Sequence, residues 1–400
     1  MAMTSSLARP ALVLFAVRAV SQVIMVVLLA ALAKMIGVDD FGAVAIAISI
    51  GAVGSGLIDF GAGAFWVREY ASGRLSHKEV SSRSAGKIAV GAISSSSLIV
   101  MGILGVIPSV TLLSGVLLFS SVVSQTALMW LVASRQSYKL SISMLLERIA
   151  LASVFFVCIF ALGIREQVAF GVSYLASAAL LLVLSGRACP DLRADFREVG
   201  WRTVWRGSRY YGLSSVTISV QGMDVILGTF IGGQSVAGAY GAVSRWTTPI
   251  ALATSSFTTL LSPVLAEAQD RHDVWRRLRT VVWIPVASGV MAVVIAGSAP
   301  VLVPFVLGNS YTPSIGVLQI LALAASLSTC SQVAQMVLQA RRRERLCAAA
   351  LACAVLIQLL AVIPMVGVYG ALGLALAALL GQIVLLVLFA AALMLILRHP

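Results

Sequence analysis

Long, uninterrupted apolar stretches recur along the whole chain. A helix rises about 1.5 Å per residue and needs about 20 mostly apolar residues to cross the roughly 30 Å of hydrocarbon in a bilayer. Because lipid offers no hydrogen-bond partner to the backbone, each such stretch is predicted to be a helix. The stretches occupy residues 11–36, 42–67, 88–107, 110–134, 140–164, 168–186, 210–232, 237–265, 280–306, 315–340, 346–368 and 370–397. The sequence therefore predicts an all-α integral membrane protein of about twelve transmembrane helices.

The positions of lysine and arginine test this assignment, because cytoplasmic connections carry an excess of positive charge. Every second predicted connection is basic, and these connections lie at 68–87, 135–139, 187–209, 271–279 and 341–345. Apart from the arginines inside helices and those at the chain ends, only Lys34 and Arg165 fall outside these connections, and the remaining connections are a few residues long. We therefore expect both termini to be cytoplasmic. The net charge of +13 is expected to meet lipid headgroups, and no nucleic acid is expected as a partner.

Two halves of the chain carry similar patterns. Ile36-Gly37 followed by Gly42 resembles Ile231-Gly232 followed by Gly238. A second set recurs 207 residues later: Ser124-Gln125, Ala127, Met129, Ala133 and Arg135 match Ser331-Gln332, Ala334, Met336, Ala340 and Arg342. Since both copies begin on the same predicted side of the membrane, we expect a parallel repeat. Two lobes of this kind are typical of transporters that open a central cavity alternately to each side.

The predicted lobes are six-helix bodies at 1–186 and 210–400, and residues 187–209 join them as a cytoplasmic interfacial linker. This linker is predicted to be a helix lying in the membrane surface. Leu192, Phe196 and Val199 would form its apolar side, and Trp201 and Trp205 would lie at headgroup depth.

Ionisable side chains inside the predicted helices are costly, so they mark either structural pairs or a functional cavity. The six are Arg18, Asp59, Glu147, Arg148, Asp224 and Arg245. Arg18 and Asp59 lie at one depth in neighbouring predicted helices, and Asp224 and Arg245 lie at another. Each pair is interpreted either as a salt bridge or as part of a cavity. Glu147 and Arg148 point about 100° apart on a helix, so a partner on another helix is expected for each.

The functional interpretation gives these residues two roles. Arg18, Gln22, Asp59, Arg148 and Arg245 are the candidate substrate-binding residues. The guanidinium fork of Arg18 suits a phosphate oxygen, and Gln22 lies on the same predicted helix face. Asp224, Gln221 and Glu147 are the candidate ion-coupling residues, because a desolvated carboxylate can exchange a proton or a cation.

Several classes of protein fit the sequence poorly. His77, His272 and His399 form no ligand constellation, so no metal site, cofactor or catalytic residue is expected. A membrane polymerase or ligase would bring a sizeable outer loop. A cationic-drug exporter would favour an acidic, aromatic-rich cavity, whereas these helices also contain arginines. A scaffold without transport would not explain the repeated halves.

The stretch from Ala33 to Ala71 contains Gly37, Phe41-Gly42, Asp59-Phe60-Gly61 and Arg68-Glu69-Tyr70-Ala71. It resembles the opening helices of the polysaccharide transport family, the Wzx-type O-antigen and exopolysaccharide flippases of the multidrug/oligosaccharidyl-lipid/polysaccharide exporter superfamily. In the second half Asp224, Gly238, Tyr240 and Pro263 are similar to family positions.

The resemblance implies that an undecaprenyl-diphosphate-linked oligosaccharide is flipped to the outer leaflet of a bacterial inner membrane, for lipopolysaccharide or exopolysaccharide synthesis. Implied partners are membrane lipid, a proton or sodium ion, and polysaccharide polymerase and glycosyltransferase proteins. A multidrug exporter or a lipid II flippase of the same superfamily is the alternative. The chain is too short for the two additional helices usual in lipid II flippases.

Overall fold

The computed structural model describes residues 2–105, 110–250, 283–340 and 343–398. The chain forms two compact units. The first contains residues 1–36 and 43–226, and the second contains residues 37–42 and 227–400. The second half of the predicted helix 237–265 and the predicted connection 271–279 lie outside the described residues, as do Arg341 and Arg342.

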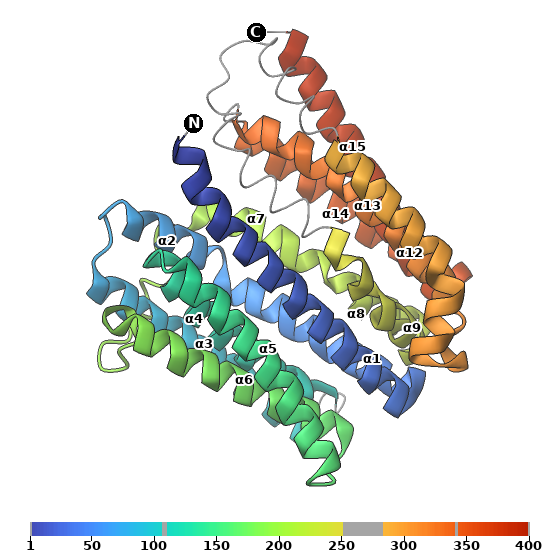
Figure 1. The fold of residues 1–400 in the computed structure, drawn as a ribbon, viewed down its shortest axis with the longest axis horizontal. Coiled ribbons are helices and arrows are strands. Elements are labelled where there is room, and N and C mark those ends of the chain that lie inside the picture. Colours follow the sequence, from blue (N-terminus) through green and yellow to red (C-terminus); the bar gives the residue numbers. More distant parts are fainter. Residues whose placement is uncertain (1, 106–109, 251–282, 341–342, 399–400) are drawn as a thin grey trace. The chain divides into compact units, whose positions relative to one another are not determined.

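The first unit is built from the two parts of the broken helix α1 (Ala2–Asp59) and from shorter helices that pack side by side (Figure 1). Helix α3 packs against α4, α4 against α6, and α5 against α6, while α2 covers one end of α4. These elements are α2 (Ala62–Ala71), α3 (His77–Ile103), α4 (Val110–Ala133), α5 (Ser137–Phe160), α6 (Glu166–Ala188), the 3-10 helix η1 (Pro190–Leu192) and α7 (Arg209–Gln221).

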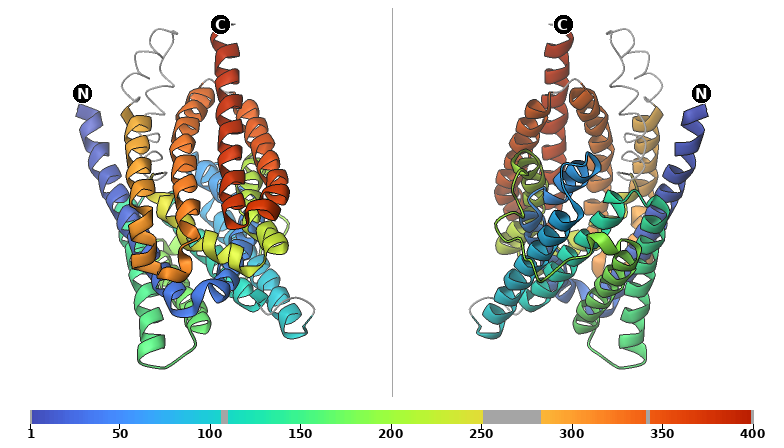
Figure 2. Two further views of the ribbon diagram at one scale, coloured as in Figure 1. Left: turned by 90° about the vertical axis from the view of Figure 1, so that its right-hand side faces the viewer. Right: turned by 90° about the vertical axis from the view of Figure 1, so that its left-hand side faces the viewer.

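The second unit repeats this arrangement of neighbours. Helix α12 packs against α13, α13 against α15, and α14 against α15, while α9 contacts α13 (Figure 2). Its elements are α9 (Gln234–Ser244), η2 (Arg245–Thr247), α12 (Trp283–Leu307), η3 (Asn309–Tyr311), α13 (Ser314–Ala340), α14 (Glu344–Tyr369) and α15 (Ala371–Arg398). Helix α8 (Met223–Gly232) runs from one unit into the other. Since α4 and α13 carry the 207-residue sequence match and have equivalent neighbours, the repeat predicted for them agrees with the packing.

Ten helices in the described residues are long and apolar enough to cross a membrane. The first of them, Ala16–Asp59, is 44 residues long and contains the non-helical Gly37, so it supplies two of the predicted crossings. This agrees with the prediction of an all-α multi-pass membrane protein of about twelve helices.

Gly37 and Gly233 show the repeat in the backbone itself. Gly37 has φ 80° and ψ 177°, and Gly233 has φ 82° and ψ −180°. Only glycine adopts this conformation readily, so both positions require it. The sequence comparison paired Gly37 with Gly232, and the structure corrects that pairing by one residue.

The two turns that these glycines make lie against each other within the second unit. A Cβ atom on Gly42 would lie 2.0 Å from the carbonyl oxygen of Gln234, and one on Gly238 would lie 2.0 Å from that of Val38. Gly238 lies 196 residues after Gly42, and Gln234 lies 196 residues after Val38, so the two contacts involve equivalent positions of the repeats. The two repeats therefore meet through equivalent contacts.

Two predicted boundaries are wrong, and one predicted span contains a break. The predicted helix 42–67 is broken after Asp59, where Phe60 and Gly61 have positive φ angles of 42° and 67°. The predicted span 210–232 agrees with the candidate membrane span Tyr211–Gly232, which is interrupted at Gly222. Helix α3 begins at His77, not at residue 88, because Ser76 and Glu79 form a reciprocal capping box in the connection before the apolar run.

The predicted interfacial helix at 187–209 is also wrong. After α6 the linker contains only η1 and a series of turns before α7 begins. Leu192 and Val204 are buried and pack into one cluster with Trp66 and Trp130. Leu192 and Val204 therefore point into the protein at separate places, whereas Phe196 and Trp201 are exposed, and the single apolar side expected of an amphipathic helix is not formed.

Candidate functional site

A buried ion pair lies where α1 breaks. The carboxylate of Asp59 accepts a hydrogen bond from the ammonium group of Lys87 on α3 and another from the backbone N–H of Gly63 at 3.3 Å. The Lys87 side chain is only 1% exposed. A buried ammonium group requires such a partner, because removal from water is costly for an unpaired charge.

This pair differs from the sequence interpretation. Lys87 was placed in a cytoplasmic connection, and a salt bridge between Arg18 and Asp59 was one of the two interpretations left open. Arg18 is half-buried and forms no ion pair within the described part of the chain. The capping box at Ser76 was the sequence signal from which an earlier start of α3 could have been predicted. A helix that starts there contains Lys87.

A cavity of about 410 Å³ opens beside Asp59 within the first unit. Its walls come from α1, α4 and α7. The polar groups are the Asp59 carboxylate, the Gln125 amide and the hydroxyl groups of Ser215 and Ser219, and Gly56 and Gly222 add backbone to the wall. Gln125 is held by a hydrogen bond from its Nε2 to Ser55 Oγ at 3.2 Å. Amide and hydroxyl groups both donate and accept hydrogen bonds, so this cavity suits a ligand rich in hydroxyl groups.

Next to Gln125 in sequence, Ser124 contacts the buried Glu147. Its hydroxyl group donates to Glu147 Oε1 at 3.3 Å, from α4 to α5. The expectation that Glu147 has a partner on another helix is therefore confirmed. Neither Glu147 nor Arg148 is among the residues that line the cavity.

Arg18 and Gln22 also lie outside the cavity lining. The Oε1 atom of Gln22 and the hydroxyl oxygen of Ser21 are buried and have no hydrogen-bond partner among the described residues. A buried polar atom in this state costs free energy unless a ligand or water satisfies it. The assignment of Arg18 and Gln22 to substrate binding stays a prediction.

The predicted ion-coupling pair lies on either side of a helix break. Gln221 ends α7, and Asp224 is in the first turn of α8, with Gly222 between the two helices. The Asp224 side chain is buried, and its Oδ1 accepts from the N–H of Val225 at 2.7 Å. A carboxylate is favourable at a helix N-terminus, which gives Asp224 a structural role in addition to the predicted one. Arg245 begins η2 in the second unit, and its role stays a prediction.

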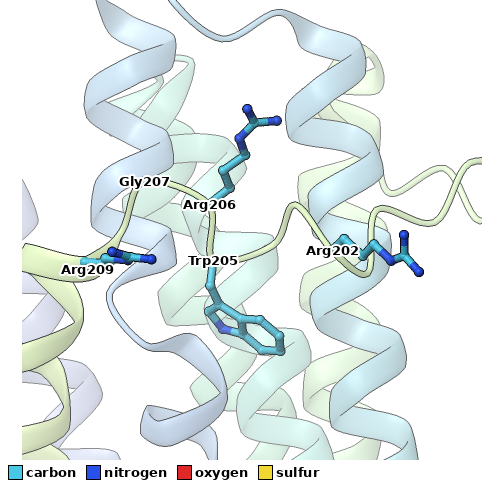
Figure 3. Close-up of a pocket in the computed structure, with 5 residues that line it drawn as sticks. All are labelled: Arg202, Trp205, Arg206, Gly207 and Arg209. Atoms are coloured by element: carbon cyan, nitrogen blue, oxygen red, sulfur yellow. The ribbon is translucent and has the colours of Figure 1, made fainter.

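A second, basic cavity lies on the linker in the same unit. It has a volume of about 510 Å³ and is lined by Arg202, Trp205, Arg206, Gly207 and Arg209. In Figure 3 the Arg206 side chain and the Trp205 ring lie on opposite sides of the loop, Arg202 points away from both, and Arg209 extends from the start of α7 towards the loop. Sequence reasoning treated these arginines as orientation signals only. The available signal was the close alternation of arginine with tryptophan in WRTVWRGSR, residues 201–209.

Comparison with known proteins adds to this description. The chain matches the model of a family described as polysaccharide biosynthesis protein over residues 31–316. A search among curated proteins gave no significant match.

Three solved structures have a similar fold. The lipid II flippase MurJ in an inward closed conformation superposes with a TM-score of 0.73 at 12% identity, covering 95% of this chain and 87% of that one. An inward-facing multidrug resistance MATE transporter of the MOP superfamily superposes with a TM-score of 0.69 at 13% identity, and the match covers 94% of this chain and 96% of that one. A mutant MATE transporter from Vibrio cholerae superposes with a TM-score of 0.64 at 16% identity, and the match covers 100% of this chain and 99% of that one. The chain therefore has the fold of these transporters.

Proposed function

Because the chain belongs to the polysaccharide biosynthesis protein family, we propose that it flips a lipid-linked oligosaccharide across a bacterial inner membrane. The substrate would be an undecaprenyl-diphosphate-linked repeat unit for O-antigen or exopolysaccharide synthesis, moved from the inner to the outer leaflet by alternating access. The two predicted lobes, 1–186 and 210–400, would be the bodies that move.

The observation that carries this proposal is the 410 Å³ cavity in a unit otherwise made of apolar helices. Hydroxyl, amide and carboxylate groups are expensive to place in such surroundings, so their convergence indicates a hydrophilic ligand. A sugar presents hydroxyl groups to which the Gln125 amide and the Ser215 hydroxyl group can both donate and accept, while the Ser219 hydroxyl group, which donates to the carbonyl of Ser215 at 2.8 Å, can accept. The likeness to a lipid II flippase supports a lipid-linked substrate.

The proposal is tested by complementing a bacterium that lacks its own O-antigen or exopolysaccharide flippase. The wild-type chain should restore surface polymer, and Gln125→Ala should reduce it at an unchanged protein level in the membrane. Gln319→Ala is the matched control, because Gln319 is exposed on α13 and outside the cavity. Arg18→Ala tests the predicted phosphate contact in the same assay. Drug resistance without surface polymer would overturn the proposal in favour of a multidrug exporter.

We also propose that the basic connections and both termini face the cytoplasm. Ser72 and Leu162 are exposed residues in connections that are predicted to lie on opposite sides. In a background without native cysteines, Leu162→Cys should react with a membrane-impermeant maleimide in intact cells, whereas Ser72→Cys should react only after lysis. The reverse pattern would invert the topology and the direction of transport.

The coupling ion is proposed to be a proton or sodium ion exchanged at Asp224. Asp224→Asn should then abolish the dependence of flipping on either gradient in vesicles that contain the purified protein. Unchanged gradient dependence would remove Asp224 from the coupling mechanism.

A further inference from the structure

The linker that carries the basic cavity is fixed to the first unit by four hydrogen bonds. Trp205 Nε1 donates to the carbonyl of Ile58 at 2.8 Å, and Trp66 Nε1 donates to that of Val204 at 3.2 Å. The backbone N–H of Gly200 donates to Ser82 O at 3.1 Å, and Arg83 Nη1 donates to Arg206 O at 3.4 Å. These bonds join the linker to α1, α2 and α3, so the loop has a defined shape.

Burial supports the same conclusion. Val204 and Ser208 are each 0% exposed, although both lie between exposed arginines. The loop therefore points its small and apolar side chains inward and its guanidinium groups outward. This alternation fixes the backbone position of each arginine. The long arginine side chains can still change conformation to contact a ligand.

The three arginines of the cavity are not neutralised by the protein. Arg202, Arg206 and Arg209 take part in no ion pair in the portion of the chain that is described. Two acidic residues of the first unit have basic partners elsewhere, since Glu198 binds Lys78 at 2.8 Å and Glu69 binds Arg74 at 2.6 Å. The cavity therefore keeps a local excess of positive charge, which attracts anions.

The start of α7 adds to this charge. Helix α7 begins at Arg209, and the N-cap residue Ser208 makes no side-chain bond to the first turn, because its hydroxyl group donates to Trp205 O at 2.9 Å. The N-terminal end of a helix carries partial positive charge, and here no capping side chain offsets it. Guanidinium groups and a helix N-terminus at one cavity suit the oxygens of a phosphoryl group.

Trp205 indicates that the ligand is a lipid headgroup at the membrane surface. Its ring lines the cavity and is held in place through its N–H. Tryptophan is the residue most typical of the interface between hydrocarbon and water, where phosphoryl headgroups lie. We propose that this basic cavity binds the phosphoryl headgroup of a membrane lipid. The inference goes beyond the proposed function, since the bound lipid need not be the transported one.

The test measures binding to the purified full-length protein in phosphatidylcholine nanodiscs. The probe is farnesyl diphosphate, a short polyprenyl diphosphate. Farnesol and inorganic diphosphate test the contributions of the phosphoryl group and of the lipid chain. Binding should be tightest for farnesyl diphosphate. Equal binding of farnesol, or of inorganic diphosphate, would overturn the proposal.

Two triple variants separate the cavity from the general positive charge. Replacement of Arg202, Arg206 and Arg209 by alanine should weaken binding by roughly tenfold or more, since charge-assisted hydrogen bonds are lost. Replacement of Arg187, Arg193 and Arg197 removes the same charge from exposed positions of the linker outside the cavity and should have less than about a twofold effect. Equal weakening in both variants would refute a local site. A triple lysine variant checks that charge without the guanidinium fork restores binding only in part.

The source of the headgroup is decided in nanodiscs that contain phosphatidylglycerol. Competition by this lipid would assign the cavity to anionic phospholipid, and no competition would assign it to a diphosphate lipid. Both results support a phosphoryl-headgroup site. Surface polymer is measured separately in cells, so loss of binding and failure of the proposed transport are distinguishable.

Discussion

The contact between the two repeats at Gly42 and Gly238 makes a quantitative prediction. An alanine at residue 42 would place its Cβ atom 2.0 Å from Gln234 O. Carbon and oxygen atoms that are not bonded rarely approach closer than about 3.2 Å, so the two backbones would have to separate by roughly 1.2 Å. Overpacking of this kind costs about 1 to 3 kcal/mol. A cost of about 2 kcal/mol, in the middle of this energy range, lowers the melting temperature by about 2 to 4 °C per kcal/mol. The substitution Gly42→Ala should therefore lower the apparent melting temperature by roughly 4 to 8 °C.

The double variant sharpens this test. Gly238→Ala should have a similar effect, because its Cβ atom would meet Val38 O at the same 2.0 Å. Once one substitution has separated the two turns, the second has more room. The combined loss should therefore be smaller than the sum of the two single losses, as expected for residues that share one contact.

Thermal unfolding of the purified protein, followed by loss of the monodisperse peak in size-exclusion chromatography, measures these effects. Gly297→Ala and Gly367→Ala are matched controls, since a Cβ atom at either position meets nothing within 4 Å and both residues are inside helices. They should leave the melting temperature unchanged or raise it slightly, because alanine favours the helix. A melting temperature for Gly42→Ala equal to that of the wild type would refute the proposed close approach.

Three further predictions concern buried polar groups. Lys87→Met should destabilise the protein by about 3 to 5 kcal/mol because it leaves the Asp59 carboxylate without its cation, and the double variant with Asp59→Asn should recover part of this loss, measured by the same thermal assay. Ser76→Ala should cost about 1 kcal/mol by removing the N-cap of α3, seen as a smaller decrease in melting temperature. Burial, together with the charge of Asp39, raises the pKa of Tyr311, so the folded protein favours the protonated phenol. Stability should then be lost as the pH rises above about 10, the ordinary tyrosine value, and Tyr311→Phe should remove this pH dependence.

The membrane spans could be predicted because one physical requirement decides them. Apolar length sufficient for a bilayer is visible in any window of the sequence, and the described spans follow it. The repeat was also visible, since a backbone conformation that needs glycine leaves a residue in the sequence to match, although at Gly37 two adjacent glycines in the second half made the match wrong by one residue. Hydropathy cannot show where a span breaks, so the turn at Phe60 and Gly61 was missed.

The partners of buried charges could not be predicted. Depth along a helix placed Arg18 level with Asp59, but depth gives no information about which helix faces which. The choice of Lys87 follows from the packing of α3 and from the break in α1. A lysine close to the start of an apolar run looks like an orientation signal in the sequence, and only the fold shows that it is buried.

The residues at the break in α1 contact both cavities. A helix that ends leaves its last carbonyl groups without helical partners. Trp205 of the linker donates to one of them, at Ile58, and the next residue, Asp59, directs its carboxylate to Lys87 while lining the polar cavity. The loop that holds the basic cavity is therefore anchored one residue away from the polar cavity.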